Sequence, residues 1–238
     1  AQLDQSIPDS TRSRLLFEMA QEVGAADTVL AFSLLEQGKE IAEQQENTEG
    51  LGTYHNILGK VFSHLGSYKR AIGHFDRALV YYREADDQVN YHQCLKEKGN
   101  VYLFQADFEQ ALNHYRTALD FYKRNHMTLG ISRCLNNMGI IHKNRGEYAE
   151  ALSAYQESLL FLDSTEHAYD ISQAYINMGN VFVYLGAFDR ALEYFGRALT
   201  ISERENFQKN ISLCLSNAGV EHNKIHDYEE ALNFYQRS

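Results

Sequence analysis

The sequence predicts an all-α protein, an α-solenoid in which antiparallel helix pairs stack into a right-handed superhelix. Three observations predict it: a strict 40-residue period, apolar residues at helical spacing within each period, and a single proline, Pro8, in 238 residues. In such an architecture each unit buries its apolar face against its neighbours. The recurring residues are the glycines Gly59, Gly99, Gly139, Gly179 and Gly219, the aromatics Tyr68, Phe108, Tyr148, Phe188 and Tyr228, the alanines Ala71, Ala111, Ala151, Ala191 and Ala231, and the aromatics Phe75, Tyr115, Tyr155, Phe195 and Tyr235.

Each unit is predicted to contain two helices joined by a very short turn. The first helix carries apolar residues three and four positions apart, as Leu135, Met138 and Ile141 do in the third unit, and this spacing places them on one face of a helix. The second helix is expected to open near Ser67, Asp107, Glu147, Ala187 and Asp227. A glycine inside a helix costs about 1 kcal/mol relative to alanine, so glycines in register at the same position predict a close crossing of the two helices.

These residues resemble the tetratricopeptide repeat, whose helix pair carries glycine, aromatic, alanine, aromatic and alanine in this order. The resemblance covers nearly the whole chain. Tryptophan and the closing proline of that family are absent, and the period is 40 rather than the usual 34 or so. The additional residues are interpreted as about one added turn of helix, because VYYREADDQVNY between two units contains no glycine or proline. Similar 40-residue variants occur in eukaryotic polarity adaptors and bacterial sensor proteins.

The repeats predict a single domain over residues 1–238. Residues 1–50 fit a degenerate helix pair in which Met19 replaces the glycine, and an end unit is expected to depart from the pattern because it lacks one neighbour. The regular units are 51–90, 91–130, 131–170, 171–210 and 211–238, of which the last is truncated within its second helix. Since a solenoid normally ends in a polar-faced helix, we expect the chain to be a segment of a longer polypeptide.

The charge of the chain argues against two classes of partner. With 22 basic and 32 acidic residues the net charge is −10, so the protein repels nucleic acid and anionic membrane surfaces. No apolar run approaches the roughly 18 residues of a membrane-spanning helix, and no membrane insertion of this segment is expected. The cytoplasm is the favoured compartment, with a periplasmic or other extracytoplasmic sensor region left open.

Cysteines and histidines are interpreted as packing residues. The three cysteines share one repeat position: Cys94, Cys134 and Cys214. Equivalent positions in neighbouring units lie too far apart for a disulfide. His142 and His222 occupy a position that is aromatic in other units. His222 and His226 are four residues apart, as metal ligands on a helix can be, but a third ligand is not visible. The catalytic motifs HExxH and GxSxG are absent, and we predict a protein that is not an enzyme and binds no metal or cofactor.

Asparagines in register are the first candidate for function. Asn137, Asn177 and Asn217 stand two residues before the unit glycine in three successive repeats. In the family that the chain resembles, this position faces the concave groove, and asparagine ladders there bind the backbone of an extended peptide. The chemistry fits, because an amide both donates and accepts. Asparagine is also a mediocre helix former, so its recurrence favours a role in binding.

A second candidate set resembles the family's carboxylate clamp, which holds the C-terminal carboxylate of a peptide. Lys96 and Asn100 match its lysine and asparagine in the second unit, and Asn137 matches its asparagine in the next. Gln173 and Asn177 stand where the clamp has lysine and arginine, so its strongest anion contacts are missing. Further candidates for binding a partner in the groove are Asn180, Arg133 and Lys143.

The leading hypothesis is therefore a non-catalytic interaction module that binds a peptide or protein segment, of another chain or of its own, in its concave face. The alternative is a sensory or regulatory region of a larger bacterial signalling protein, such as a kinase or transcription regulator. A third hypothesis is self-association, because uncapped solenoid ends expose apolar surface on which a second copy can stack.

Overall fold

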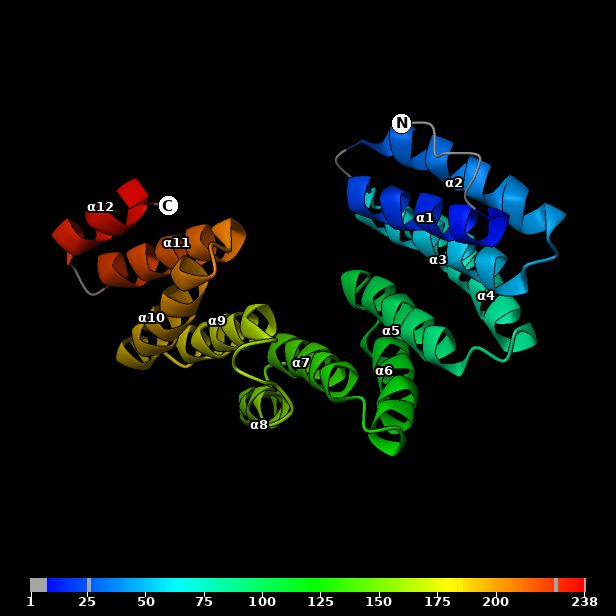
Figure 1. The fold of residues 1–238 in the computed structure, drawn as a ribbon. Coiled ribbons are helices and arrows are strands. Elements are labelled where there is room, and N and C mark those ends of the chain that lie inside the picture. The colour runs from blue at the N-terminus through cyan, green and yellow to red at the C-terminus, as the bar shows by residue number, and fades with distance from the viewer. Residues whose placement is uncertain (1–7, 25–26, 225–226, 238) are drawn as a thin grey trace. The chain divides into compact units, whose positions relative to one another are not determined.

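The computed structural model describes residues 8–24, 27–224 and 227–237, and all regular secondary structure within them is helical (Figure 1). The chain forms two compact units, Ala1–Ala118 and Leu119–Ser238, here called unit 1 and unit 2. The boundary falls inside helix α6 (Phe108–Arg124), so it does not coincide with a repeat boundary. The organisation as a single domain stays a proposal. None of the described helices combines the length and the apolar character needed to cross a membrane.

Unit 1 is built from successive antiparallel helices. They are α1 (Asp9–Val23), α2 (Thr28–Gln44), α3 (Thr48–His64), α4 (Tyr68–Glu84) and α5 (Gln88–Phe104), followed by the beginning of α6. Asp27, Asn47 and Asp87 start α2, α3 and α5 by accepting a hydrogen bond from the backbone N–H three residues on, at 2.9–3.0 Å. Side-chain oxygens at this position satisfy amides that the helix itself leaves unpaired.

Unit 2 continues the same alternation. Its helices are the end of α6, then α7 (Thr128–Asn144), α8 (Tyr148–Leu159), α9 (Ala168–Tyr184), α10 (Phe188–Arg204), α11 (Gln208–Lys224) and α12 (Tyr228–Arg237). Helices α7 and α8, α9 and α10, and α11 and α12 pack against each other as pairs. The predicted α-solenoid of helix pairs is confirmed.

The 40-residue period is present in the backbone as well as in the sequence. The first helices α3, α5, α7 and α11 begin at Thr48, Gln88, Thr128 and Gln208, so each starts a whole number of periods after the first. In the four pairs from α3 and α4 to α9 and α10, the turn has a left-handed residue at the same position, namely Gly66, Ala106, Gly146 or Gly186, with φ between 57° and 78°. Glycine adopts this conformation without strain, which explains why the inner glycine recurs.

The repeat glycines lie where an aromatic ring of the second helix crosses the first. A Cβ atom added at Gly59 would come within 2.5 Å of the ring of Phe75, and one added at Gly139 would come within 2.6 Å of Tyr155. The same relation holds at Gly99 and Gly179. These four glycines are therefore needed for close packing, as the sequence predicted, and their helix pairs bury the aromatic rings Phe75, Tyr115, Tyr155 and Phe195 almost completely.

The degenerate first pair uses the same contact with the roles of its helices exchanged. Phe17 of α1 packs on Gly38 of α2, where an added Cβ would meet the ring at 2.6 Å. Met19 takes the place of the usual glycine in the first helix. The pair therefore retains a ring-on-glycine crossing even though its sequence departs from the pattern.

Helix α8 ends earlier than its counterparts. It contains 12 residues, whereas the second helices α4 and α10 contain 17. Asp163 Oδ1 accepts hydrogen bonds from the backbone N–H groups of Thr165 and Glu166 at 2.8 and 3.2 Å, a local turn that competes with helix formation. Helix α8 therefore departs from the regular helix length of its counterparts, because side-chain bonding at Asp163 replaces the last helical turn.

A half-buried histidine pair lies between α3 and α4. The Nδ1 atoms of His55 and His74 are 3.1 Å apart, and the rings stack on Tyr81 and Phe62, respectively. Burial, followed by the charges of neighbouring groups that include Arg77, lowers the pKa of His55 to about 4. Burial and nearby arginines also lower the pKa of His74.

We expect this pair to make the protein less stable in mild acid. The unfolded chain takes up protons near pH 6.5, but folded His55 does so only near pH 4, so stability present above pH 6.5 is lost as the pH falls toward 4. After a discount for partial exposure, the free energy of unfolding should fall by about 1 kcal/mol between pH 7 and pH 5. Urea unfolding at the two pH values measures it. His55→Leu, which copies the leucine of the equivalent position in other repeats, should reduce the difference, and an unchanged difference would contradict the assignment.

Candidate binding surface

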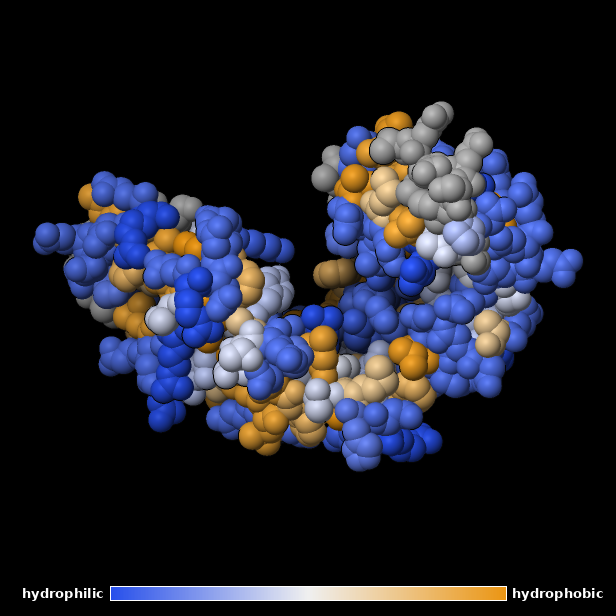
Figure 2. Space-filling model, viewed as in Figure 1, coloured by the Kyte–Doolittle hydropathy of each residue, from blue (hydrophilic) through white to orange (hydrophobic). Residues whose placement is uncertain are grey.

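The first helices of successive pairs form one continuous face in each unit. Helix α3 contacts α1 and α5 in unit 1, and α9 contacts α7 and α11 in unit 2. Among the described residues, the second helices α2 and α4, or α8 and α10, make no such contact with each other. Because the first helices approach more closely, they lie on the inner side of the curvature within each unit. Figure 2 shows that hydrophilic residues cover most of the visible surface of both units.

Two of the three asparagines in register, Asn177 and Asn217, bond between neighbouring first helices. Asn177 Nδ2 of α9 donates to Asn136 Oδ1 of α7 at 3.0 Å, and Asn217 Nδ2 of α11 donates to Asn180 Oδ1 of α9 at 3.2 Å. Asn177 is 7% exposed, whereas Asn217 and Asn137 are half-buried. The amides thus connect one repeat to the next. An amide that donates one hydrogen bond keeps a second N–H group and an oxygen that can accept.

The residues that match the carboxylate clamp already have an internal carboxylate. Glu97 Oε1 forms an ion pair with Lys96 Nζ at 3.0 Å, and Glu97 Oε2 accepts a hydrogen bond from Asn100 Nδ2 at 2.9 Å. Burial by itself would raise the pKa of the Glu97 carboxyl, but the charges of Lys96 and Lys60 and these hydrogen bonds together lower it. The structure therefore places an acidic residue of this chain where a peptide terminus would compete for the same contacts.

The same network reaches the crossing helix α6, because Tyr115 Oη donates to Asn100 Oδ1 at 2.7 Å. Tyr155 occupies the equivalent position one repeat later, and no described residue bonds its buried hydroxyl. Tyr115→Phe should therefore destabilise the protein by about 1–2 kcal/mol, whereas Tyr155→Phe should be neutral or stabilising. Urea unfolding of the two variants checks this expectation. Equal losses would show that the network contributes nothing at Tyr115.

Two cationic candidates of unit 2 have internal contacts. Arg133 of α7 pairs with Asp170 of α9 through two bonds, Nε to Oδ1 at 2.8 Å and Nη2 to Oδ2 at 3.1 Å, so it connects adjacent repeats as the asparagines do. Lys143 lies with its Nζ 5.9 Å from the centre of the Tyr184 ring, and burial lowers the pKa of this amine. The Lys143 amine therefore lies beside an exposed aromatic side chain, whereas the Arg133 guanidinium is paired with a carboxylate.

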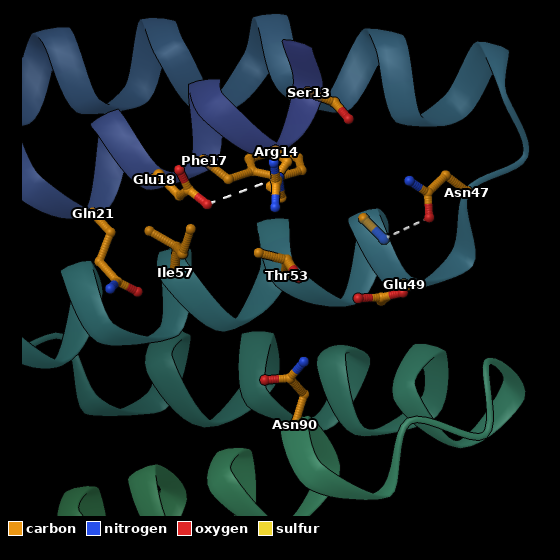
Figure 3. A pocket seen from close by; sticks show the side chains of 11 residues that line it. Ser13, Arg14, Phe17, Glu18, Gln21, Asn47, Glu49, Thr53, Ile57 and Asn90 are labelled. Carbon is orange, nitrogen blue, oxygen red and sulfur yellow. Dashed lines mark hydrogen bonds and ion pairs between the residues drawn. The ribbon is translucent and has the colours of Figure 1, made fainter. Parts of the chain in front are cut away.

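A groove of about 350 Å³ lies between α1 and α3, with Asn90 of α5 at its edge (Figure 3). Phe17 and Ile57 give it an apolar portion, and Arg14 and Glu18 give it a charged one. The two charged groups are 3.9 Å apart and largely exposed, so their interaction is weak. A mixed lining of this kind suits an extended polypeptide better than a small apolar ligand.

Lys60 and Phe104 are inner-face residues that the sequence reasoning missed. Both line a cavity of about 400 Å³ between α3, α4 and α5. Lys60 directly follows its unit glycine and therefore occupies the same repeat position as Asn100 and Asn180. Comparison of that position, or column, between repeats would have found it. Phe104 is 62% exposed, and its exposure could not be read from the sequence.

The histidines and cysteines have the packing environments that their positions predicted. Cys94, Cys134 and Cys214 are buried free thiols. His142 is half-buried, and its Nδ1 lies 2.5 Å from Glu147 Oε2. His222 stacks on Phe234, and His226 lies outside the described residues. The part of the chain that the structure describes contains no group of three potential metal ligands.

Several solved structures share this fold. A Rap protein complexed with Competence and Sporulation Factor has a TM-score of 0.79 and 19% identity, over 100% of this chain and 65% of the other. Aspartyl phosphate phosphatase F of Bacillus subtilis has a TM-score of 0.74 and 11% identity, over 96% of this chain and 69% of the other. The quorum sensor NprR of B. thuringiensis in its apo form has a TM-score of 0.74 and 16% identity, over 98% of this chain and 64% of the other. NprR in complex with its cognate peptide NprX has a TM-score of 0.72 and 16% identity, over 98% of this chain and 67% of the other.

At these identities the likeness shows the fold, and the chain spans about two thirds of the length of these proteins. No curated protein sequence matches the chain. The sequence model of the tetratricopeptide repeat matches residues 51–124, 95–164, 130–204 and 170–238, which together cover everything from Leu51 onwards. With its glycine-on-ring helix pairs and this match over most of its length, the chain belongs to the tetratricopeptide repeat family.

Proposed function

We propose that the protein is a non-catalytic module that holds an extended segment of a protein or peptide along its first helices. The observation that carries the proposal is the likeness over nearly the whole chain to NprR and Rap, which were solved with a cognate peptide and with Competence and Sporulation Factor. The curvature of each unit supports it, because the closely spaced first helices offer a continuous face for a chain to lie along.

The chemistry of the inner face also supports a peptide ligand. An extended backbone offers unpaired N–H and C=O groups, and main-chain bonding gives affinity without regard to side chains. The half-buried amides of Asn137 and Asn217 lie on α7 and α11. An amide can accept a hydrogen bond from a backbone N–H group and donate one to a backbone C=O group. Asn177 is the least exposed of the three, and we assign it mainly to the bond between repeats.

A peptide-display selection on the whole chain tests this proposal. We expect selected peptides to lose about tenfold in affinity when Asn137 and Asn217 are both replaced by alanine, which corresponds to about 1.4 kcal/mol. Asn113→Ala, an exposed asparagine on the second helix α6, is the matched control and should leave affinity unchanged. If the double variant keeps its far-UV circular dichroism and its affinity, these asparagines do not bind the ligand.

The non-catalytic part of the proposal has a separate test, because one structural neighbour is named a phosphatase. The protein should not accelerate the hydrolysis of acyl phosphates, for example acetyl phosphate or an aspartyl-phosphorylated response regulator. Release of inorganic phosphate above the protein-free rate would contradict the assignment.

A second candidate function is the sensory region of a larger signalling protein. It is favoured by the likeness to the quorum sensor NprR, of which this chain would span 64%. Reading the gene on both sides of the chain tests it. Kinase or DNA-binding motifs in the same reading frame would support the sensor role, and a gene that encodes only these repeats would exclude it.

A further inference from the structure

The cavity between α3, α4 and α5 has an apolar wall that is open to solvent. The rings of Tyr68 and Phe104 stack with their centroids 6.2 Å apart and their planes 19° apart, and Phe75 lines the same cavity. Phe104 is 62% exposed, although burial of a phenyl group is worth roughly 1.5–3 kcal/mol. An aromatic pair of which one ring is exposed and the other half-buried, beside a cavity of about 400 Å³, is suited to receive a large apolar side chain.

The polar side of the cavity carries two opposite charges, Lys60 and Glu97, of which Glu97 is already in a close ion pair with Lys96. Glu97 is neutralised by Lys96, and both of its oxygens are occupied. Lys60, which also lines the cavity, donates only to the neutral amide of Gln21, from Nζ to Oε1 at 3.2 Å. Among the described residues, no carboxylate lies within 4 Å of this ammonium. The cavity therefore presents, beside an aromatic wall, an ammonium that forms no close ion pair and acts on Glu97 only at longer range.

From this arrangement we propose that the cavity is a specificity pocket for a segment with a large apolar residue followed by an acidic one. The apolar side chain packs on Tyr68 and Phe104, and the side-chain carboxylate pairs with Lys60. This inference rests on the proposed function and names the sequence that this part of the inner face prefers.

The acid is a side-chain carboxylate rather than a chain terminus. A terminal carboxylate on Lys96 and Asn100 would have to displace Glu97 from both of its partners. The lysine charges and hydrogen bonds that lower the pKa of the Glu97 carboxyl against the effect of burial keep that carboxylate ionised and bonded at neutral pH. Lys60 requires no such displacement, because among the described residues its ammonium bonds only the neutral amide of Gln21.

The test uses blocked tetrapeptides on the whole chain, followed by NMR of the backbone amides. The probes are acetyl-Ala-Phe-Glu-Ala-amide and its Gln and Lys counterparts. We expect the Glu peptide to bind up to about fivefold more tightly than the Gln peptide, and the Lys peptide to bind most weakly, since one half-exposed ion pair contributes up to about 1 kcal/mol. The largest shifts should fall in α3 and α5. Addition of salt should reduce the advantage of the Glu peptide.

Three variants separate the contributions. Lys60→Met should remove the preference for Glu while the Gln peptide binds as before, and Phe104→Ala should weaken all three peptides. Lys69→Met, an exposed lysine on α4 that does not line the cavity, is the control and should change nothing. A preference for Glu that survives Lys60→Met overturns the proposal.

Two further outcomes contradict the inference. A Gln peptide with a free C-terminus that binds as tightly as the blocked Glu peptide would show that a terminal carboxylate is recognised. Display-selected peptides that bind the chain without shifting amides of α3 and α5 would overturn this pocket and leave the proposed function standing. The absence of any selected binder would overturn the proposed function itself.

Discussion

Replacement of Phe75 by alanine is expected to lower the free energy of unfolding by about 3–5 kcal/mol, the usual loss for a buried phenylalanine. Phe75 is 1% exposed and its ring lies directly on Gly59, so the backbones of α3 and α4 are already at close approach and cannot collapse further into the space. Urea unfolding followed by far-UV circular dichroism measures the loss.

The matched control is Val80→Ala on the same helix. Val80 is 50% exposed, and a substitution at such a surface position should change stability by less than about 0.5 kcal/mol. A loss below about 1 kcal/mol for Phe75→Ala would mean that the ring does not hold the helix pair together.

Addition of one methyl group at the glycine of an equivalent contact, Gly179 against Phe195, should also destabilise the protein. A Cβ atom at Gly179 would lie 2.5 Å from the ring of Phe195, so Gly179→Ala requires the two helices to separate. Overpacking of this kind costs about 1–3 kcal/mol, which exceeds the gain of up to 1 kcal/mol or so from the better helix propensity of alanine. The thermal midpoint should fall.

Gly196 provides the control in the next helix of the same unit. It lies inside α10, and nothing would come within 4 Å of an added Cβ. Gly196→Ala should therefore stabilise by up to about 1 kcal/mol. The two substitutions are chemically identical, so opposite signs isolate the helix crossing as the cause, and a stabilising effect at Gly179 would refute it.

The repeat determines most of the fold because its physics is local. Residues 40 apart have the same neighbours, so α3, α5, α7 and α11 begin in register and the glycine-on-ring contact recurs. The early end of α8 could not be predicted from the period, because the Asp163 turn is a side-chain effect within one unit. The exchanged roles of Phe17 and Gly38 were missed for a similar reason, since pattern matching assigns each residue type to one helix.

The binding surface was less predictable than the fold. The sequence identified the helices and columns, but the bond from Asn177 to Asn136 joins two different columns of neighbouring repeats. Which repeat positions come into contact between neighbouring helices depends on the rotation from one helix to the next, and that angle cannot be derived from the period of the sequence. The pairing of Lys96 with Glu97 concerns adjacent residues, so a check of neighbouring charges would have found it.

The central claim, that the first helices are the binding surface, is tested most directly by photo-cross-linking. A display-selected peptide carrying benzoylphenylalanine is bound to the whole chain, irradiated, and its attachment sites are mapped by mass spectrometry. We predict attachment to α3 and α5 in unit 1 or to α7, α9 and α11 in unit 2, with competition by the unlabelled peptide. Attachment concentrated on the second helices α2, α8 or α10 would contradict the account.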